Sequence, residues 1–509
     1  MKQYKIGLLI LSLLASTALW AQNEFDALRY SKLQYEGTAR TLGMGNAFTA
    51  LGGDLGAISL NPAATAIFHH SSFTITPSLN ISGEQANYLD NLSKTTNSRF
   101  GISNVGYVAY YPTGRKQGLI NFNFAVVSNQ IANYNGINAA TGINNQQSLL
   151  GAIANNVRGV NPDRLTITDQ QSPFGNIADL YIQAYNCYLI DPLVDENNQF
   201  TGEYIGATEI INDQGQRVLA APVQQRYERY SAGYNNDIAF SMGGNINHKF
   251  FFGINLSIQS IWYQSAEYTQ ENALHENDFP ETGFQSMRHS YHLSGSGTGF
   301  NARAGIIWLP IRGLRLGASV ATPTWIRMQE RWYYTMDSQL KQAYYCDSPD
   351  YAYNYGIRSP WRWNIGAAYT FGRRGLISVD YENVNYGNIE MSYNGATSWF
   401  KEENGRIQRN FCNVNIVRAG AEYRITEAWS ARAGYNYYSH STLDWNDALH
   451  LASVGAGYSN GPFFADLAYQ HPLQWQEETF SFFPNGNNNP MVESKYRNIR
   501  LLLTVGLRF

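Results

Sequence analysis

The chain has few charged residues and, after its first 21 residues, no long hydrophobic run. Charged side chains make up 15% of the 509 residues, whereas an average soluble domain has about 25%. A net charge of −3 argues against a basic surface for nucleic acid, and 14% aromatic residues argue against disorder. A bundle of membrane helices is excluded, because each span needs roughly 18 apolar residues.

Cysteine is scarce, and its pattern indicates no metal site. Cys187, Cys346 and Cys412 form no C-x-x-C pair. Cys187 and Cys346 lie in polar stretches, where they either pair in an oxidising compartment or stay free. Catalytic motifs are also lacking: His275-Glu276 does not continue as a zinc-protease motif, and Ser296 lacks the glycine that a nucleophile elbow needs. We therefore expect no enzyme, no cofactor and no metal.

The first residues are typical of a secretory signal peptide, residues 1–21. Lys2 and Lys5 precede an apolar run over 6–15, and a cleavage site follows between Ala21 and Gln22, with Leu19 at position −3. Cysteine does not follow this site, so a lipid anchor is not expected. The mature chain is therefore predicted to be exported.

From Ser72 onwards the sequence alternates between apolar and polar residues. In the last twelve residues, Ile499, Leu501, Leu503, Val505, Leu507 and Phe509 fall on one face. A period of two predicts strands with one apolar face. The pattern returns at 120–126, 254–259, 314–320 and 361–369.

About fourteen such strands can be placed, an even number as in bacterial outer-membrane barrels. Short connections at 112–115, 310–313, 372–375, 426–427 and 459–461 alternate with long ones at 131–226, 331–356 and 477–492. We expect an all-β fold: an antiparallel transmembrane barrel over 72–509 in a Gram-negative outer membrane, with an extracellular insertion at about 131–226. A soluble β-sandwich is the alternative, but its strands are usually nearer 5–6 residues.

The region before the barrel, 22–71, is rich in glycine and alanine. It contains Ala39–Ala50 (ARTLGMGNAFTA), then Asp54 and the run Asn61-Pro62-Ala63-Ala64. Together with glycine–aromatic strands such as 364–369 and 454–458, this resembles the FadL family of outer-membrane channels for hydrophobic molecules, which includes fatty-acid and toluene transporters.

The resemblance implies a fourteen-stranded barrel whose lumen is blocked by an N-terminal hatch, residues 22–71. In that family, outer loops capture ligands and pass them to a site in the lumen. A shift of the hatch then releases them, often sideways through a kink in the third strand. Here the third strand, 119–129, contains neither glycine nor proline, so the sequence predicts no kink in it.

The hatch motif comprises Gly43, Gly45, Asn61, Pro62 and Ala63. Pro62 fixes its φ angle, and Asn61 can cap its own backbone. The motif is therefore either a rigid structural turn or a direct ligand contact.

Five arginines on the polar faces of strands are candidate ligand-binding residues in the lumen: Arg303, Arg315, Arg362, Arg432 and Arg500. A charge facing lipid at mid-depth costs about 2–4 kcal/mol, so these side chains should face inwards. They either hold the carboxylate of an amphiphile or form a network with Asp380, Glu382 and Asp466 that fixes the hatch.

The insertion contains two amphipathic helical patterns. Leu149, Ile153 and Val157 share one face, as do Ile177, Tyr181, Ala184 and Tyr188. These faces either capture ligand at the surface or pack on each other.

The expected function is passive uptake of small hydrophobic compounds, such as long-chain fatty acids, by a monomer. The expected partners are membrane lipid and lipopolysaccharide, a hydrophobic ligand or detergent in the lumen, and the barrel-assembly machinery through Phe509. The alternative is a partner in protein secretion that binds exported proteins through its outer loops.

Overall fold

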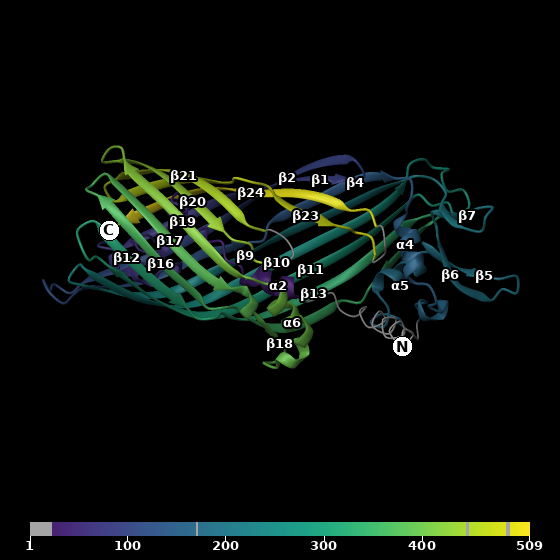
Figure 1. Cartoon of the computed structure of the whole chain (residues 1–509), viewed down its shortest axis with the longest axis horizontal. Helices are drawn as coiled ribbons and strands as arrows, with labels where there is room; N and C mark the ends of the chain where they lie inside the picture. Colours follow the sequence, from purple (N-terminus) through teal and green to yellow (C-terminus); the bar gives the residue numbers. More distant parts are fainter. Residues whose placement is uncertain (1–22, 169–171, 444–446, 485–488) are drawn as a thin grey trace, which may run out of the picture.

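The computed structural model describes residues 23–168, 172–443, 447–484 and 489–509. The predicted signal peptide, residues 1–21, lies outside the described residues. The chain forms a closed antiparallel β-barrel of 14 strands (Figure 1), so the predicted fold class is confirmed and a two-sheet sandwich is excluded. Among the described residues, no helix is long and apolar enough to cross a membrane.

Several barrel strands are interrupted and resume after a bend, so the wall contains more pieces than strands. In order around the wall the pieces are β1 (Ser72–Tyr88), β2 (Asn91–Pro112), β3 (Leu119–Asn133) with β4 (Gly136–Asn144), β9 (Val223–Ile246), β10 (Phe250–Ala273), β11 (Ser286–Trp308), β12 (Leu314–Ala321) with β13 (Trp325–Gln339), β14 (Ala343–Asp347) with β15 (Tyr351–Arg358) and β16 (Arg362–Phe371), β17 (Gly375–Asn385) with β18 (Glu390–Ser392), β19 (Asn413–Arg424), β20 (Trp429–Tyr438), β21 (Leu449–Asn460), β22 (Phe463–Pro472) with β23 (Gln476–Phe480), and β24 (Val492–Arg508). Pairing of β1 with β24 closes the barrel.

The helices and the remaining strands lie before or between these pieces. The N-terminal segment, residues 23–71, contains α2 (Glu24–Ser31), α3 (Ala39–Gly43), η1 (Gly56–Ser59) and η2 (Pro62–Ile67). The insertion contains α4 (Leu149–Asn156), η3 (Pro162–Arg164), α5 (Asp179–Asn186) and the hairpins β5 (Ile190–Val194) with β6 (Phe200–Gly206) and β7 (Glu209–Ile211) with β8 (Arg217–Leu219). Between β17 and β19 lie η4 (Tyr386–Asn388), η5 (Thr397–Phe400) and α6 (Lys401–Asn410).

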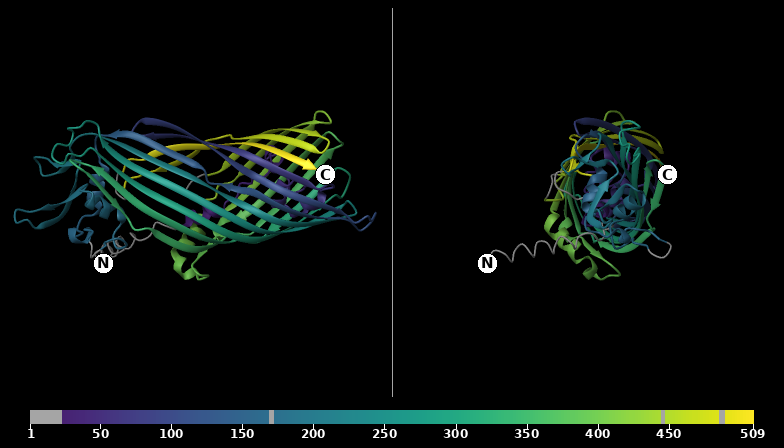
Figure 2. Two further views of the ribbon diagram at one scale, coloured as in Figure 1. Left: turned by 180° about the vertical axis from the view of Figure 1, so that it is seen from behind. Right: turned by 90° about the vertical axis from the view of Figure 1, so that its right-hand side faces the viewer.

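The two ends of the barrel differ. At the turn end, where β1 begins and the C-terminus lies, short turns join the strands; at the loop end lie the insertion and the other long connections (Figures 1 and 2). Two sequence-based boundaries need correction at the loop end. The insertion spans 145–222, because β4 continues the wall to Asn144, and 331–356 is mostly strand, with a tight turn after Gln339.

The alternation of the sequence places apolar side chains on the outside of the wall. Along β24, Leu501, Leu503 and Val505 point outwards and are 37–46% exposed, whereas Leu502 and Thr504 are buried. Exposed tryptophans, Trp325, Trp361 and Trp363, accompany this outer apolar band towards the loop end. The wall therefore presents an apolar outside and an inside that other parts of the chain fill.

Candidate functional site

The N-terminal segment lies inside the barrel and bonds to inward-facing side chains on many strands. The Asn436 amide donates to Gly45 O at 2.6 Å, Ser319 Oγ donates to Leu60 O at 2.7 Å, and Asn255 donates to Ile58 O at 2.8 Å. These donors come from β20, β12 and β10. Because strands from different sides of the wall hold its carbonyls, the segment fills the turn half of the lumen with few orphaned backbone groups.

A belt of inward-facing glycines lets the wall approach the backbone of this segment. A Cβ at Gly317 would lie 2.6 Å from the Thr49 carbonyl carbon, and one at Gly243 would lie 2.8 Å from Ala66 N. The other members of the glycine belt also contact the segment at residues 43–62: Gly253, Gly305, Gly366, Gly420, Gly434 and Gly455. A larger side chain would displace backbone at Gly243, Gly253, Gly317, Gly420 or Gly434, and would displace side chains at Gly305 or Gly366, so the belt fixes the close fit of the segment.

The residues of the predicted hatch motif all lie in this fitted region. Asn61 caps η2 by accepting from Ala63 N at 3.0 Å, as its sequence predicts, and its amide donates to Thr49 O and to Ile306 O. Pro62 stands at the first position of η2, where its missing N–H costs nothing. Gly45 has a φ of 60°, and Gly43 packs against Gly455. The motif thus acts as a structural turn in the segment.

Four of the five predicted arginines contact the N-terminal segment directly. Arg315 donates to Leu51 O at 2.7 Å. Arg500 donates to Gln34 Oε1 at 2.7 Å, and its Nε lies 3.4 Å from the carboxylate of Glu36. Both arginines therefore position the segment.

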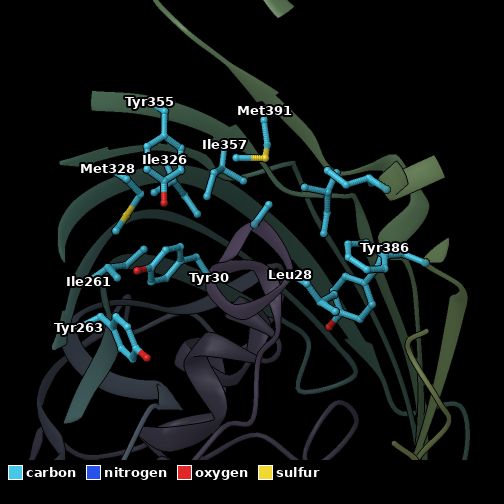
Figure 3. Close-up of a cluster of buried hydrophobic side chains, with 14 of the residues drawn as sticks. Leu28, Tyr30, Ile261, Tyr263, Ile326, Met328, Tyr355, Ile357, Tyr386 and Met391 are labelled. Atoms are coloured by element: carbon cyan, nitrogen blue, oxygen red, sulfur yellow. The ribbon is translucent and has the colours of Figure 1, made fainter. Parts of the chain in front are cut away.

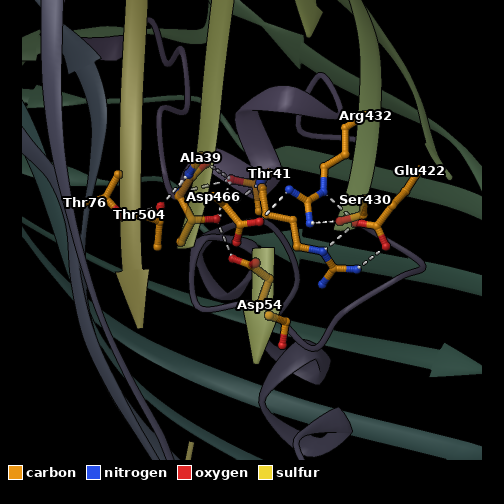
Figure 4. Close-up of polar contacts among 12 residues, drawn as sticks. Ala39, Thr41, Asp54, Thr76, Glu422, Ser430, Arg432, Asp466 and Thr504 are labelled. Carbon is orange, nitrogen blue, oxygen red and sulfur yellow. Dashed lines mark hydrogen bonds and ion pairs between the residues drawn. The ribbon is translucent and has the colours of Figure 1, made fainter. Parts of the chain in front are cut away.

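Two others, Arg362 and Arg432, bind acidic residues on neighbouring strands. Arg432 donates to Glu422 and to Asp466, each at 2.6 Å (Figure 4), and Arg40 of the segment donates to the same Glu422 at 2.9 Å. Arg362 donates to Glu382 at 2.7 Å and to Ser31 O at 2.6 Å. All predicted arginines face inwards, and these four join the network that fixes the segment.

Arg303 has spare hydrogen-bonding capacity that no acidic partner fills by a hydrogen bond. Its guanidinium donates to the Tyr35 hydroxyl at 3.3 Å, while its second terminal nitrogen is buried without a hydrogen-bond partner. A further arginine, Arg418, which no sequence pattern singled out, is fully buried, donates to Glu382 at 2.5 Å and leaves two guanidinium nitrogens without a hydrogen-bond partner. Both guanidinium groups lie within 6 Å of the Tyr35 ring centroid. This pair could hold a carboxylate.

Towards the loop end, the lumen changes to an apolar, tyrosine-rich lining. The wall strands that carry the glycine belt carry apolar side chains nearer the loop end. Ile261 lies beyond Gly253 on one strand, and Ile326 and Met328 lie beyond Gly317 on another. They join Tyr263, Leu293, Trp332, Tyr355, Ile357, Val384, Tyr386, Ile389, Met391, Phe400, Ile407, Phe411, Val414 and Ile416 in one buried cluster, called here the tyrosine cluster. No motif predicted it, because its members come from distant strands.

Helix α2 occupies the tyrosine cluster. Figure 3 shows Tyr30 of α2 beside Ile261 and Met328 of the wall, and Leu28 on the side of Tyr386. The hydroxyls of Tyr30 and Tyr355 donate to one carboxylate oxygen of Glu330, at 3.0 and 2.7 Å. The N-terminal segment therefore reaches from the glycine belt into an apolar site.

The third strand bends away from the second just beyond 119–129, the stretch in which the sequence predicts no kink. Pairing of β2 with β3 ends at Asn104↔Asn129, and β3 contains a bulge between Gln130 and Ala132. Beyond that point the edge of β2, residues 91–103, pairs with β1 on one side only in the described ladder. Phe100 on this edge is 77% exposed and lies in register with Leu79 and Leu501 of the outer apolar band.

Residues 34–37, called here the strap, cover this gap from inside. The backbone N–H groups of Gln34 and Glu36 donate to Ile131 O at 2.7 Å and Gln130 O at 3.0 Å, and Ser103 Oγ donates to Gly37 O at 2.9 Å. The strap thus supplies part of the pairing that β2 does not give to β3. A local pattern of glycine and proline could not reveal this bend, because the competing donors come from a segment far away in sequence.

In the insertion, the apolar helix faces pack inwards. Leu149, Ile153 and Val157 are at most 2% exposed and belong to the core of the insertion. Tyr181 packs partly against the same core, whereas Tyr188 is 53% exposed and its ring centroid lies 4.5 Å from that of Tyr344. Of the candidate residues for ligand capture, Leu149, Ile153, Val157, Tyr181 and Tyr188, only Tyr188 presents most of its surface to the outside.

The thiols of Cys187 and Cys346 meet where the insertion contacts β14. Neither is in a disulfide, and the hydrogen bond between them is the main factor that raises the pKa of Cys187. Cys187 Sγ also donates to Met336 O at 3.5 Å, and Met336 pairs with Cys346 across β13 and β14. In the described part of the chain, no group of three His, Cys, Asp or Glu residues could hold a metal ion.

Comparison with solved structures identifies the fold. The toluene transporter TodX of Pseudomonas putida matches with a TM-score of 0.51 and 11% identity, over 94% of this chain and 99% of that one. A FadL homologue of Pseudomonas aeruginosa matches with a TM-score of 0.50 and 13% identity, again over 94% and 99%. This chain has the fold of the FadL-type outer-membrane barrels. No protein-family model and no curated protein match the sequence.

Proposed function

We propose that this protein is an outer-membrane channel for the passive uptake of small hydrophobic compounds, such as long-chain fatty acids. The observation that carries the proposal is the division of its lumen into a filled, polar turn half and an apolar tyrosine cluster. The apolar outer band suits a lipid bilayer, and a barrel of this size needs a plug to remain a barrier. The toluene transporter and the FadL homologue with this fold support the same conclusion.

In this proposal the N-terminal segment is the hatch. The ligand competes with α2 for the tyrosine cluster, and a carboxylate head would reach Arg303 and Arg418. Movement of the strap then frees the gap between β2 and β3, whose edge lies in the apolar outer band. An apolar compound leaving there enters lipid without crossing water, which is the energetically favourable route.

The test compares uptake of labelled palmitate, oleate and toluene in cells with and without the gene. We expect faster uptake of at least one compound in cells that have the gene; equal rates for all of them would contradict the proposal. Mass spectrometry of the protein purified from native membranes separates the alternatives. A bound hydrophobic compound favours uptake, whereas a stoichiometric exported protein favours the secretion partner.

A further inference from the structure

A second irregularity of the wall lies in three neighbouring strands. The ladder is broken at 322–324 between β12 and β13, at 359–361 between β15 and β16, and at 386–389 between β17 and β18. The flanking pairs Ala321↔Arg362 and Trp325↔Arg358 show that the first two breaks lie opposite each other. The pairs Arg362↔Val384 and Arg358↔Glu390 place the third break at the same level.

The sequence explains why pairing stops here. Pro323 and Pro360 have no N–H to donate to a neighbouring strand. Across this level, Ser359 N donates to Thr324 O at 3.0 Å, and Thr324 N donates to Ser359 Oγ at 2.8 Å. On the third strand, Asn385 caps the turn η4 by accepting from Gly387 N. Two prolines and one capped turn thus produce a shared break.

A cavity of 410 Å³ occupies this break. The excursion 386–412, which includes α6, forms its far side and projects from the barrel (Figure 1). The lining combines apolar groups, Pro323, Pro360, Trp361 and Ile389, with the polar groups Ser359, Asn388, Asn404 and Gln408. The ion pair of Arg358 with Glu390 also borders it, so the cavity carries no unpaired charge from this pair.

The cavity lies directly beside the tyrosine cluster. Ile389 lines the cavity and is also a buried member of that cluster. The excursion itself contacts α2: Arg406 donates to Glu24 at 2.9 Å, and the rings of Phe25 and Phe411 are 5.9 Å apart. A group that entered the cavity and displaced Ile389 would therefore meet the apolar site that α2 occupies.

The mouth of the cavity lies at the level where tryptophans mark the membrane–water interface, next to lipid head groups. Trp361, Trp363 and Trp325 flank the break and are 50–57% exposed, and tryptophan concentrates at the membrane–water interface. Asn388 and Gln408 at the rim are exposed and offer amide donors and acceptors. The site therefore suits a molecule with a polar head and an apolar chain.

We propose that this cavity is a side entrance through which a single-chain amphiphile passes from the outer leaflet to the tyrosine cluster. Its head binds among Asn388, Gln408 and Ser359, while its chain passes Ile389. The inference rests on the proposed uptake function but differs from it in the route. The gap between β2 and β3 lies several strands away around the wall, so entrance and exit are separate openings.

Gln408→Trp tests the entrance, because it fills the rim of the cavity from the exposed face of α6. Glu402→Trp is the matched control: it lies on the same helix, is 87% exposed and does not line the cavity. The probes are tritiated palmitate for uptake and a diazirine-labelled palmitic acid for mapping, both in cells that produce the full chain. We expect Gln408→Trp to slow palmitate uptake at least about fivefold and to abolish labelling at Trp361 and Ile389, with the control unchanged.

Each outcome decides one question. Normal uptake in Gln408→Trp, with labelling only on the insertion, would overturn the side entrance while leaving the uptake function intact. Absence of uptake by the unmodified protein would instead overturn the function itself. Equal labelling of the cavity by a diazirine-labelled diacyl phospholipid would show a bound membrane lipid and would also overturn the entrance.

Discussion

The two halves of the lumen hold the same N-terminal segment in different ways. In the turn half, the glycine belt touches its backbone, and donors such as Asn436 and Ser319 hold its carbonyls. In the loop half, α2 is held by apolar packing, by the hydroxyl of Tyr30 and, at its two ends, by Arg406 on Glu24 and Arg362 on Ser31 O. A backbone fitted against glycine cannot be replaced by a ligand, whereas an apolar contact can. The difference assigns the barrier to one half and ligand binding to the other.

The largest expected effect comes from adding a side chain in the glycine belt, which tests whether the turn half forms the barrier. In Gly317→Val, the new side chain overlaps the backbone of Thr49, so the segment must move. We expect the single-channel conductance in planar bilayers to rise at least about tenfold as the lumen opens to water. Gly83→Val is the control, since nothing lies within 4 Å of its Cβ position. Conductance equal to that of the unmodified protein would show that the belt does not hold the barrier.

The next largest expected effect is a loss of thermal stability when the charged network of the turn half is broken. Glu382 accepts from both Arg362 and Arg418, and all three side chains are at most 4% exposed. Glu382→Gln leaves two buried guanidinium groups without a countercharge, and breaking a buried pair costs about 3–5 kcal/mol.

The measurement is the temperature at which the folded band disappears in a gel-shift assay, which should fall clearly. Glu477→Gln is the matched control, because Glu477 pairs with Lys495 at an exposed position, and exposed pairs contribute about 0–1 kcal/mol. Equal transitions for both variants would mean that the network does not stabilise the barrel.

The sequence predicts the barrel because a period of two assigns every strand residue to one face, as β24 shows. It does not predict the glycine belt, since belt residues such as Gly317 and Gly366 become neighbours only through strand pairing. The prediction of a loop over 331–356 is wrong for a related reason. The strands of this stretch extend past the apolar outer band, where polar residues such as Asp337 and Gln339 need no apolar partner face. The arginines were identified from their polar faces, but which of them keeps a free N–H depends on the segment packed against it.

The competition between α2 and ligand is tested by a smaller change, Tyr30→Phe. The variant keeps the aromatic packing but loses the hydrogen bond to Glu330, worth about 0.5–1.5 kcal/mol. A weaker hold on α2 should tighten the binding of a fluorescent fatty acid up to about tenfold, with no change in conductance. Tyr355→Phe removes a bond to the same carboxylate from the wall side and leaves the bond of α2 in place. Unchanged or weaker binding in Tyr30→Phe alone would mean that Tyr30 is part of the binding site and not a competitor.

The smallest expected effect is on the rate of ligand release when one side chain of the strap is changed, because the backbone hydrogen bonds of the strap remain. Glu36→Gln removes the charge opposite Arg500 but keeps an amide in place, and Gln34 and Gln470 still accept from that guanidinium. We expect release of bound fatty acid to become about two- to threefold faster, because only the ion pair that holds the strap is lost. Stopped-flow transfer of a fluorescent fatty acid to acceptor vesicles measures this rate, with the exposed Glu493→Gln on β24 as control. If the rate stays constant while Tyr30→Phe changes binding, the strap does not limit release, and the gap between β2 and β3 is not the exit.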